Sequence, residues 1–127
     1  MKNYTMTKER NRRLRQEVAR EMRLSGCKDA RVALARVLRR PLERGFYLGV
    51  ETVLVMDRRR RNGALPVRGK RRAAMWADLL GQVDCLMASD PGLTRVDAVC
   101  KVLATGTSRM GFMLGPERGL RVLGSDF

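Results

Sequence analysis

The densest group of chemically active side chains in this sequence is a pair of arginine-rich runs near its middle. Residues 58–61 are four consecutive arginines, and residues 68–72 carry four further cations around one glycine. Cations this close together repel one another unless an anion lies between them. We therefore expect residues 58–72 to form a mobile linker that becomes ordered on a phosphate backbone, with a merely solvated linker as the alternative.

Guanidinium and ammonium groups bind phosphate esters because they combine charge with several hydrogen-bond donors. Other cations surround the apolar stripes of the two helices that we predict before this linker. The predicted phosphate-contacting residues are Arg10, Arg12, Arg13, Arg39, Arg40, Arg58, Arg59, Arg60, Arg61, Arg68, Lys70, Arg71 and Arg72.

The net charge of the chain has the same implication. The 127 residues include 27 Lys and Arg against 13 Asp and Glu, a formal charge of +14. Residues 1–72 hold 22 of the basic and 7 of the acidic residues, whereas residues 73–127 hold 5 and 6. Charge of this size predicts a polyanionic partner. The neutral part is expected to complete the core or to meet a protein partner, with simple sequence drift as the alternative.

Residue types for catalysis or metal binding are scarce. The chain has no His and no glycine-rich phosphate loop, and its paired carboxylates lie at helix-surface spacings. Cys27, Cys85 and Cys100 lack CxxC spacing, so we expect reduced, buried thiols. The sequence thus predicts no enzyme, no metal site and no cofactor.

Hydropathy gives no sign of a membrane segment. The longest apolar stretch, residues 46–56, is interrupted by Glu51 and is too short to cross a bilayer. Residues 1–6 lack the apolar segment of a secretory signal. We expect a cytoplasmic protein without a membrane partner.

The sequence resembles itself at a shift of 65 residues, which becomes 66 after one extra residue in the second copy. This register aligns identical residues at thirteen of the 41 positions from 14 to 54, where unrelated chains of average composition give about three. The aligned pairs include Phe46 with Phe112, which we interpret as core residues. We predict an internal duplication.

Each copy is predicted to contain three helices. In the first copy, apolar residues follow helical spacing over about residues 7–24 and again after Ser25-Gly26. In the second copy, Thr94 begins a capping box, and Gly115 followed by Pro116 is a typical helix start.

The predicted fold class is all-α. Two tandem three-helix, helix-turn-helix-like repeats would form one compact helical domain. Residues 1–57 would be the basic repeat, residues 58–72 the arginine-rich linker and residues 73–127 the neutral repeat.

Residues 28–60 have the outline of a helix-turn-helix, whose second helix would enter the major groove of DNA. The predicted solvent-facing residues of that helix are Thr52, Val55 and Arg59, and Thr52 is our candidate for base-edge contact. The connection over residues 40–49 is longer than the usual turn, so a looser three-helix bundle is the alternative.

The segments 37–54 and 102–120 resemble a group of uncharacterised small basic bacterial proteins. Those proteins repeat V-L, then R-F-Y-(L/V), then E-x-x-(L/R). This chain departs from the pattern by placing Gly45 between Arg44 and Phe46. The resemblance implies a shared helical architecture alone, since the group has no established function.

The function predicted from the sequence is binding of double-stranded DNA through its phosphate backbone, in a regulatory or architectural role. Structured RNA, including ribosomal RNA, is the closest alternative, because the same charges would serve it. The low aromatic content argues against stacked single strands. A helical adaptor that docks on an acidic protein is a further alternative, which salt dependence would distinguish.

Overall fold

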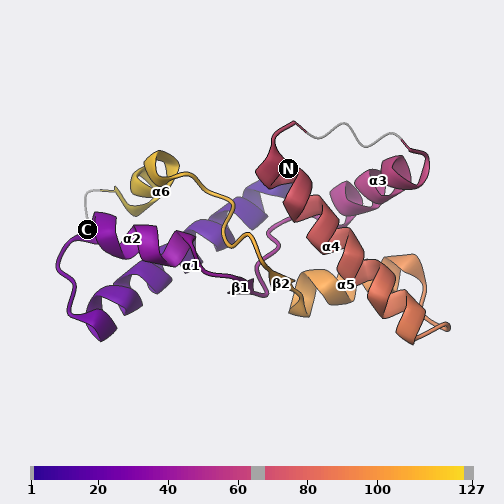
Figure 1. Cartoon of the computed structure of the whole chain (residues 1–127), viewed down its shortest axis with the longest axis horizontal. Helices are drawn as coiled ribbons and strands as arrows, with labels where there is room; N and C mark the ends of the chain where they lie inside the picture. The colour runs from indigo at the N-terminus through magenta and orange to yellow at the C-terminus, as the bar shows by residue number, and fades with distance from the viewer. Residues whose placement is uncertain (1, 64–67, 125–127) are drawn as a thin grey trace.

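The computed structural model describes residues 2–63 and 68–124, and these residues are mostly helical. In chain order the elements are α1 (Lys2–Ser25), α2 (Ala30–Leu38), β1 (Leu42–Glu43), α3 (Val50–Arg61), α4 (Lys70–Ser89), α5 (Arg95–Thr105), β2 (Thr107–Ser108) and α6 (Pro116–Leu123). The order helix, helix, short strand, helix therefore occurs twice along the described chain (Figure 1). The all-α class is confirmed at this coarse level, with two short strands in addition.

Helix ends follow the capping residues that the sequence provides. Thr94 precedes α5, and its side chain accepts a hydrogen bond from the backbone N–H of Asp97 at 3.2 Å. Asp29 does the same for Arg31 at the start of α2, at 3.0 Å. Each cap satisfies an N–H group that the first turn of a helix leaves without an internal partner.

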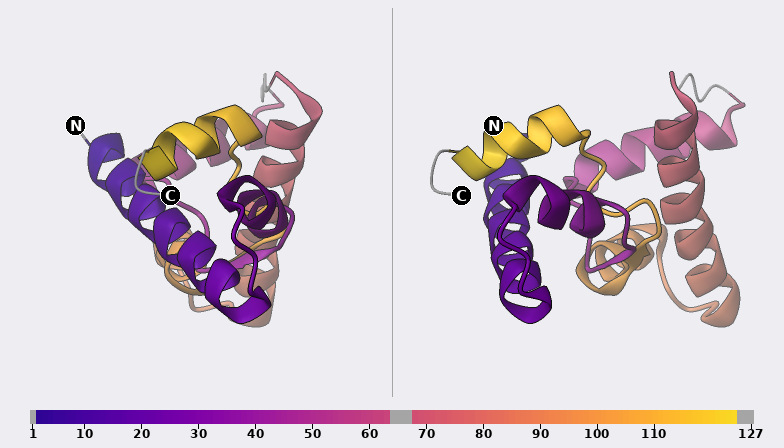
Figure 2. Two further views of the ribbon diagram at one scale, coloured as in Figure 1. Left: turned by 90° about the vertical axis from the view of Figure 1, so that its left-hand side faces the viewer. Right: turned by 60° about the vertical axis from the view of Figure 1, so that its left-hand side comes forward.

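The third helix of each half packs on the other half of the chain. α6 packs against α1 and α2, and α3 packs against α5. We call α1, α2 and α6 the first lobe, and α3, α4 and α5 the second lobe. Figure 1 shows the lobes side by side with the strands between them, and Figure 2 shows α6 beside α1 and α2. The two tandem three-helix repeats are therefore not confirmed as packed units.

This exchange also changes the helix-turn-helix interpretation of residues 28–60. The helices that pack on α2 are α1 and α6, whereas α3 packs in the other lobe. α2 and α3 therefore do not form the compact helix pair that the motif requires.

Two apolar cores accompany the two lobes. Phe46, from the connection before α3, lies in the core with Trp76 and Leu79 of α4. Phe112, from the connection before α6, lies in the core with Leu14 of α1. The prediction that both phenylalanines are core residues is confirmed, since they are 5% and 3% exposed. Each half of the chain thus supplies an aromatic side chain to the opposite lobe.

The chain crosses between the lobes at β1 and β2, which pair antiparallel. Leu42 pairs with Ser108, and Glu43 pairs with Thr107. A shift of 65 residues exchanges these two pairs, so the ladder has local two-fold symmetry. Gly111 follows the second crossing with φ of +70°, and a Cβ atom there would lie 2.6 Å from the carbonyl oxygen of Arg40. Only glycine fits this position.

Candidate nucleic-acid interface

Helix α3 ends with the four-arginine run, so these residues are helical and are not part of an irregular linker. Arg58 and Arg59 are exposed and have no ion pair within the described chain. Arg60 and Arg61 are bound to the carboxylate of Asp57, at 2.9 Å and 3.2 Å. The run therefore contains two cations without an ion pair and two that are paired with a carboxylate.

Asp57 is the fully buried centre of an ionic network between three helices. Besides the two arginines of α3, Arg95 of α5 places its Nε 3.3 Å from Asp57 Oδ2. Arg60 also donates two hydrogen bonds to Asp84 of α4, at 2.7 Å and 3.0 Å. A buried carboxylate is stable only when it is paired and hydrogen-bonded. The network fixes the end of α3 against α4 and α5.

The pKa values in this network shift as its geometry requires. The hydrogen bond from Arg60, together with the charges of Arg60 and Arg95, lowers the pKa of Asp84 despite partial burial. The same hydrogen bond to Asp84 raises the pKa of Arg60. Both groups are therefore held in their charged forms.

Helix α4 begins with Lys70, Arg71 and Arg72, and its first turn has no acidic residue. The N-cap is Gly69, with φ of +89° and no capping side chain. All three cations are exposed, as is the preceding Arg68. The N-terminus of a helix carries partial positive charge, so cations there are unfavourable by roughly 0.3–1 kcal/mol each. An anion bound at this turn would remove that penalty.

The predicted cations of α1 differ in their surroundings. Arg12 pairs with Glu9 at 2.8 Å on the surface of the same helix. Arg13 donates hydrogen bonds to the carbonyl oxygen of Arg44 at 3.0 Å and to the hydroxyl oxygen of Tyr47 at 3.2 Å. Arg13 therefore holds the connection after β1 against α1, which is a structural role.

Arg10 of α1 is partly buried and lies near Arg118 of α6. Its guanidinium donates to Asn11 Oδ1 at 3.0 Å and 3.2 Å. Burial and the nearby charge of Arg118 lower the pKa of Arg10. Arg10 and Arg118 thus lie close enough to repel each other, and neither has an ion pair within the described chain, in contrast to the network around Asp57.

Arg39 and Arg40, at the end of α2, also have different roles. Arg40 and Arg36 bind the nearly buried carboxylate of Glu21, which ties α2 to α1. Arg39 is exposed and has no ion pair among the residues that the structure describes. Of this pair, only Arg39 is available to an external anion without breaking a contact of the fold.

The outer face of α3 is exposed as the helical spacing predicts. Thr52 and Arg59 are exposed, and Val55 is 43% exposed. The Thr52 side chain makes no hydrogen bond within the described chain. Its proposed contact with bases stays a prediction.

Two exposed arginines of α6 were absent from the predicted site. Arg118 and Arg121 make no ion pair within the described chain. The 66-residue shift aligns Arg118 with Thr52 and Arg121 with Val55. The repeat alignment could therefore have identified Arg118 and Arg121 as exposed, because Thr52 and Val55 lie on the outer face of the equivalent helix.

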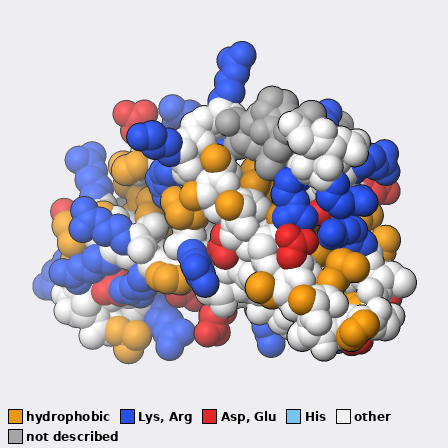
Figure 3. Space-filling view, turned by 45° about the vertical axis from the view of Figure 1, so that its right-hand side comes forward, with side chains coloured by type: hydrophobic (Ala, Val, Ile, Leu, Met, Phe, Trp, Pro, Cys, Tyr) orange, Lys and Arg blue, Asp and Glu red, His pale blue; other side chains and the backbone are white. Residues whose placement is uncertain are grey.

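Figure 3 shows how the charges are distributed on one face of the molecule. Blue Lys and Arg side chains gather on its left part and again on its right, below the grey atoms, with fewer acidic side chains among them. By sequence position, the cations at the end of α3 and the start of α4 belong to the second lobe. Basic charge is therefore present on both lobes, although it comes mainly from the first half of the sequence.

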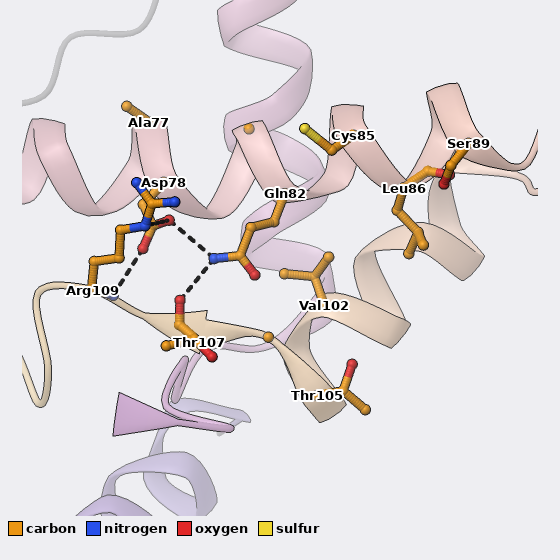
Figure 4. Close-up of a pocket in the computed structure, with 12 residues that line it drawn as sticks. Ala77, Asp78, Gln82, Cys85, Leu86, Ser89, Val102, Thr105, Thr107 and Arg109 are labelled. Atoms are coloured by element: carbon orange, nitrogen blue, oxygen red, sulfur yellow. Dashed lines mark hydrogen bonds and ion pairs between the residues drawn. The ribbon is translucent and has the colours of Figure 1, made fainter. Parts of the chain in front are cut away.

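A cavity of about 710 Å³ lies along α4 and α5 and is lined by polar groups that already bind one another (Figure 4). Asp78 accepts hydrogen bonds from the side chain of Gln82 and from the backbone N–H of Arg109, both at 3.0 Å. Gln82 also donates to the carbonyl oxygen of Thr107 at 2.7 Å. These contacts fasten the second crossing to α4. The 65-residue shift aligns Asp78 with Arg13 and Arg109 with Arg44, so the contact of Asp78 with Arg109 corresponds to the contact of Arg13 with the first crossing.

The prediction that the three thiols are buried is wrong. Cys85 and Cys100 are exposed and Cys27 is partly exposed, because Cys85 and Cys100 lie off the apolar faces of α4 and α5. Among the described residues, no group of three His, Cys, Asp or Glu side chains is placed to hold a metal ion.

Comparisons with protein-family models, curated proteins and solved structures found no match. None of the described helices combines the length and apolarity needed to cross a bilayer.

Proposed function

We propose that this protein binds double-stranded DNA through its phosphate backbone, using the end of α3 and the start of α4. The observation that carries the proposal is the set of six exposed cations at the end of α3, just before α4 and in the first turn of α4. Its members are Arg58, Arg59, Arg68, Lys70, Arg71 and Arg72. They have no carboxylate partner among the described residues, and counterion release on a phosphate backbone would favour their binding.

The spacing of the two groups supports a duplex with a wide groove. The contact of Arg60 with Asp84 places the end of α3 beside the C-terminal half of α4. The first turn of α4 then lies about 18 Å further along that helix, at about 1.5 Å per residue. The major groove of B-DNA is about 12 Å wide, so long side chains can reach phosphates on both of its edges. The major groove of A-form RNA is narrow and deep, which favours DNA.

The ionic network makes this surface a fixed one. Asp57 pairs with Arg60 and Arg61 and holds the last turn of α3 in place. Arg58 and Arg59 are thereby presented from a rigid helix, which lowers the conformational entropy lost on binding. Thr52, on the same helix, would supply limited base contact.

Fluorescence anisotropy on a random-sequence DNA duplex and a matched RNA duplex tests the proposal. We expect salt-sensitive binding, with tighter binding to DNA. Replacing both Arg58 and Arg59 by Ala should lower the slope of log affinity against log salt by about 1.8, since two phosphate contacts are lost. Circular dichroism should be unchanged, because neither side chain has a partner in the fold.

The matched control replaces Arg20 and Lys101 by Ala. Both are exposed cations outside the proposed surface, without an ion pair among the residues described. Equal loss of binding in the two double variants would contradict a defined surface, and absence of salt-sensitive binding to either duplex would contradict the function. Tighter binding to the RNA duplex would reassign the partner to structured RNA.

A further inference from the structure

A second cavity, of about 360 Å³, lies where the two lobes meet. Three arginines line it: Arg39 at the end of α2, Arg71 in the first turn of α4, and Arg109 after β2. They are far apart in the sequence and are brought together only by the crossing of the chain between the lobes. Among the described residues that line the cavity there is no Asp or Glu.

The arginines are free to face a ligand. Arg39 and Arg71 have no ion pair within the described chain. The side chain of Arg109 is 84% exposed, and its only carboxylate contact among the described residues is Asp78 at 3.8 Å. Its backbone N–H, in contrast, is firmly bound to Asp78 at 3.0 Å. The position of the residue is therefore fixed while its guanidinium can turn.

Three guanidinium groups in one small cavity favour an anion with more than one charge. A phosphate monoester carries about −1.5 to −2 charge at neutral pH. A phosphodiester within a strand carries only one negative charge. Bidentate contact with the three oxygens of a monoester would also suit the planar arginine side chains.

The rest of the cavity wall is apolar. Leu38 of α2, with Met110 and Leu114 of the connection before α6, faces the same space. The volume is at the lower end of the range, about 300–1,000 Å³, of sites for small molecules. An apolar wall beside a phosphate site suits the sugar and base of a nucleotide, against which an arginine plane can also stack.

We propose that this cavity binds the phosphate monoester of a nucleotide, either a free nucleoside 5′-monophosphate or the 5′-phosphorylated end of a strand. The strand-end form rests on the proposed duplex binding, whereas the free-nucleotide form does not. Because residues of both lobes line the cavity, the ligand would also hold the lobes together across the crossing.

Isothermal titration calorimetry with adenosine 5′-monophosphate, and with adenosine for comparison, tests the free-nucleotide form. Binding should require the phosphate. It should weaken by at least about tenfold in Arg39→Gln and in Arg71→Gln, since each loses a charged hydrogen bond. Arg31→Gln is the control, because Arg31 is an exposed cation on α2 that does not line this cavity. A loss in Arg31→Gln equal to that in Arg39→Gln would overturn the proposal.

Anisotropy with one DNA duplex, prepared with 5′-phosphate or 5′-hydroxyl ends, tests the strand-end form. Tighter binding of the phosphorylated duplex, abolished in Arg71→Gln, would assign the cavity to strand ends. Nucleotide binding without this preference would assign it to free nucleotides. Absence of both effects would overturn the proposal, even if the duplex itself binds. If the duplex does not bind, the calorimetric result alone decides.

Discussion

The two lobes are built from equivalent elements, yet some aligned positions of their interiors hold different kinds of side chain, and Asp57 is the fully buried case. The 66-residue shift aligns Asp57 of α3 with Leu123 of α6. Asp57 is fully buried and binds three arginines, whereas Leu123 is 3% exposed and packs in an apolar core. The same place in the fold is thus filled by an ionic network in one lobe and by an aliphatic side chain in the other.

This difference indicates that the buried charge of Asp57 serves to position the exposed end of α3 rather than to stabilise the core. Replacing a buried ion pair by apolar residues is often neutral or stabilising, so Leu123 represents the simpler solution. The Asp57 network instead fixes the helix end that presents Arg58 and Arg59. We infer that the second lobe keeps its buried carboxylate because that end must be held in place.

Asp57→Ala should have the largest effect on stability. It leaves Arg60, Arg61 and Arg95 without their shared buried partner, and breaking a buried pair in this way costs about 3–5 kcal/mol. Urea unfolding monitored by the fluorescence of Trp76, the single Trp, would measure the loss in the second lobe.

Asp57→Leu is the matched comparison, since it introduces the aligned residue of the other lobe. It should be less destabilising than Asp57→Ala because it fills the space that the carboxylate occupied. A loss below about 1 kcal/mol in Asp57→Ala would show that the network is not needed for folding.

Local features of the fold could be predicted from the sequence, but the exchange of third helices could not. The cap at Thr94 and the helix start at Gly115 depend only on neighbouring residues, and both are present. Phe46 and Phe112 were identifiable as core residues, yet either would fit either lobe because the halves are alike. Apolar spacing indicates that a helix face is buried and does not indicate which helix covers it.

Part of the candidate site could be predicted from the sequence, but the ion pairs between residues far apart in the chain could not. The exposed cations of α3 and α4 follow from composition. The pairing of Arg60 with Asp57 could not be predicted from composition, because in the sequence Asp57 looks like an ordinary surface residue beside four arginines. Its burial depends on Arg95, which lies 38 positions away. Similarly, Arg13 was expected to meet phosphate, but it holds the connection at Arg44.

Gly111→Ala should have the next largest effect, because it acts at the crossing that both lobes share. The positive φ is strained for Ala, and the new Cβ would meet the backbone of Arg40. We expect a loss of about 2 kcal/mol or more. Gly63→Ala is the control, with φ of +75° and no atom within 4 Å of the new Cβ. Equal losses in the two variants would show that the close approach at the crossing is unimportant.

Removal of one chosen arginine from each lobe should have opposite effects on stability. Arg95→Gln removes a partner of Asp57 and Asp84 and should cost about 1.5 kcal/mol, the typical loss for a charged hydrogen bond. Arg118→Gln removes a charge that repels Arg10 and should stabilise the protein slightly. Thermal unfolding followed by circular dichroism measures both. A destabilising Arg118→Gln would contradict the proposed repulsion between α1 and α6.

The smallest expected effect is a pH dependence that belongs to the second lobe. Since Arg60 and Arg95 lower the pKa of Asp84 below its usual 3.8, the contribution of this carboxylate to stability is complete above that pH. It is lost as the pH falls further, through the pKa of the folded state. In Asp84→Asn, the free energy of unfolding should therefore decline less steeply between about pH 4 and pH 2. Lys101→Gln, which removes a distant positive charge, should keep the parent slope. If Asp84→Asn also kept that slope, the acid sensitivity would have to arise elsewhere, and the contacts of Asp84 would add nothing to the asymmetry between the lobes.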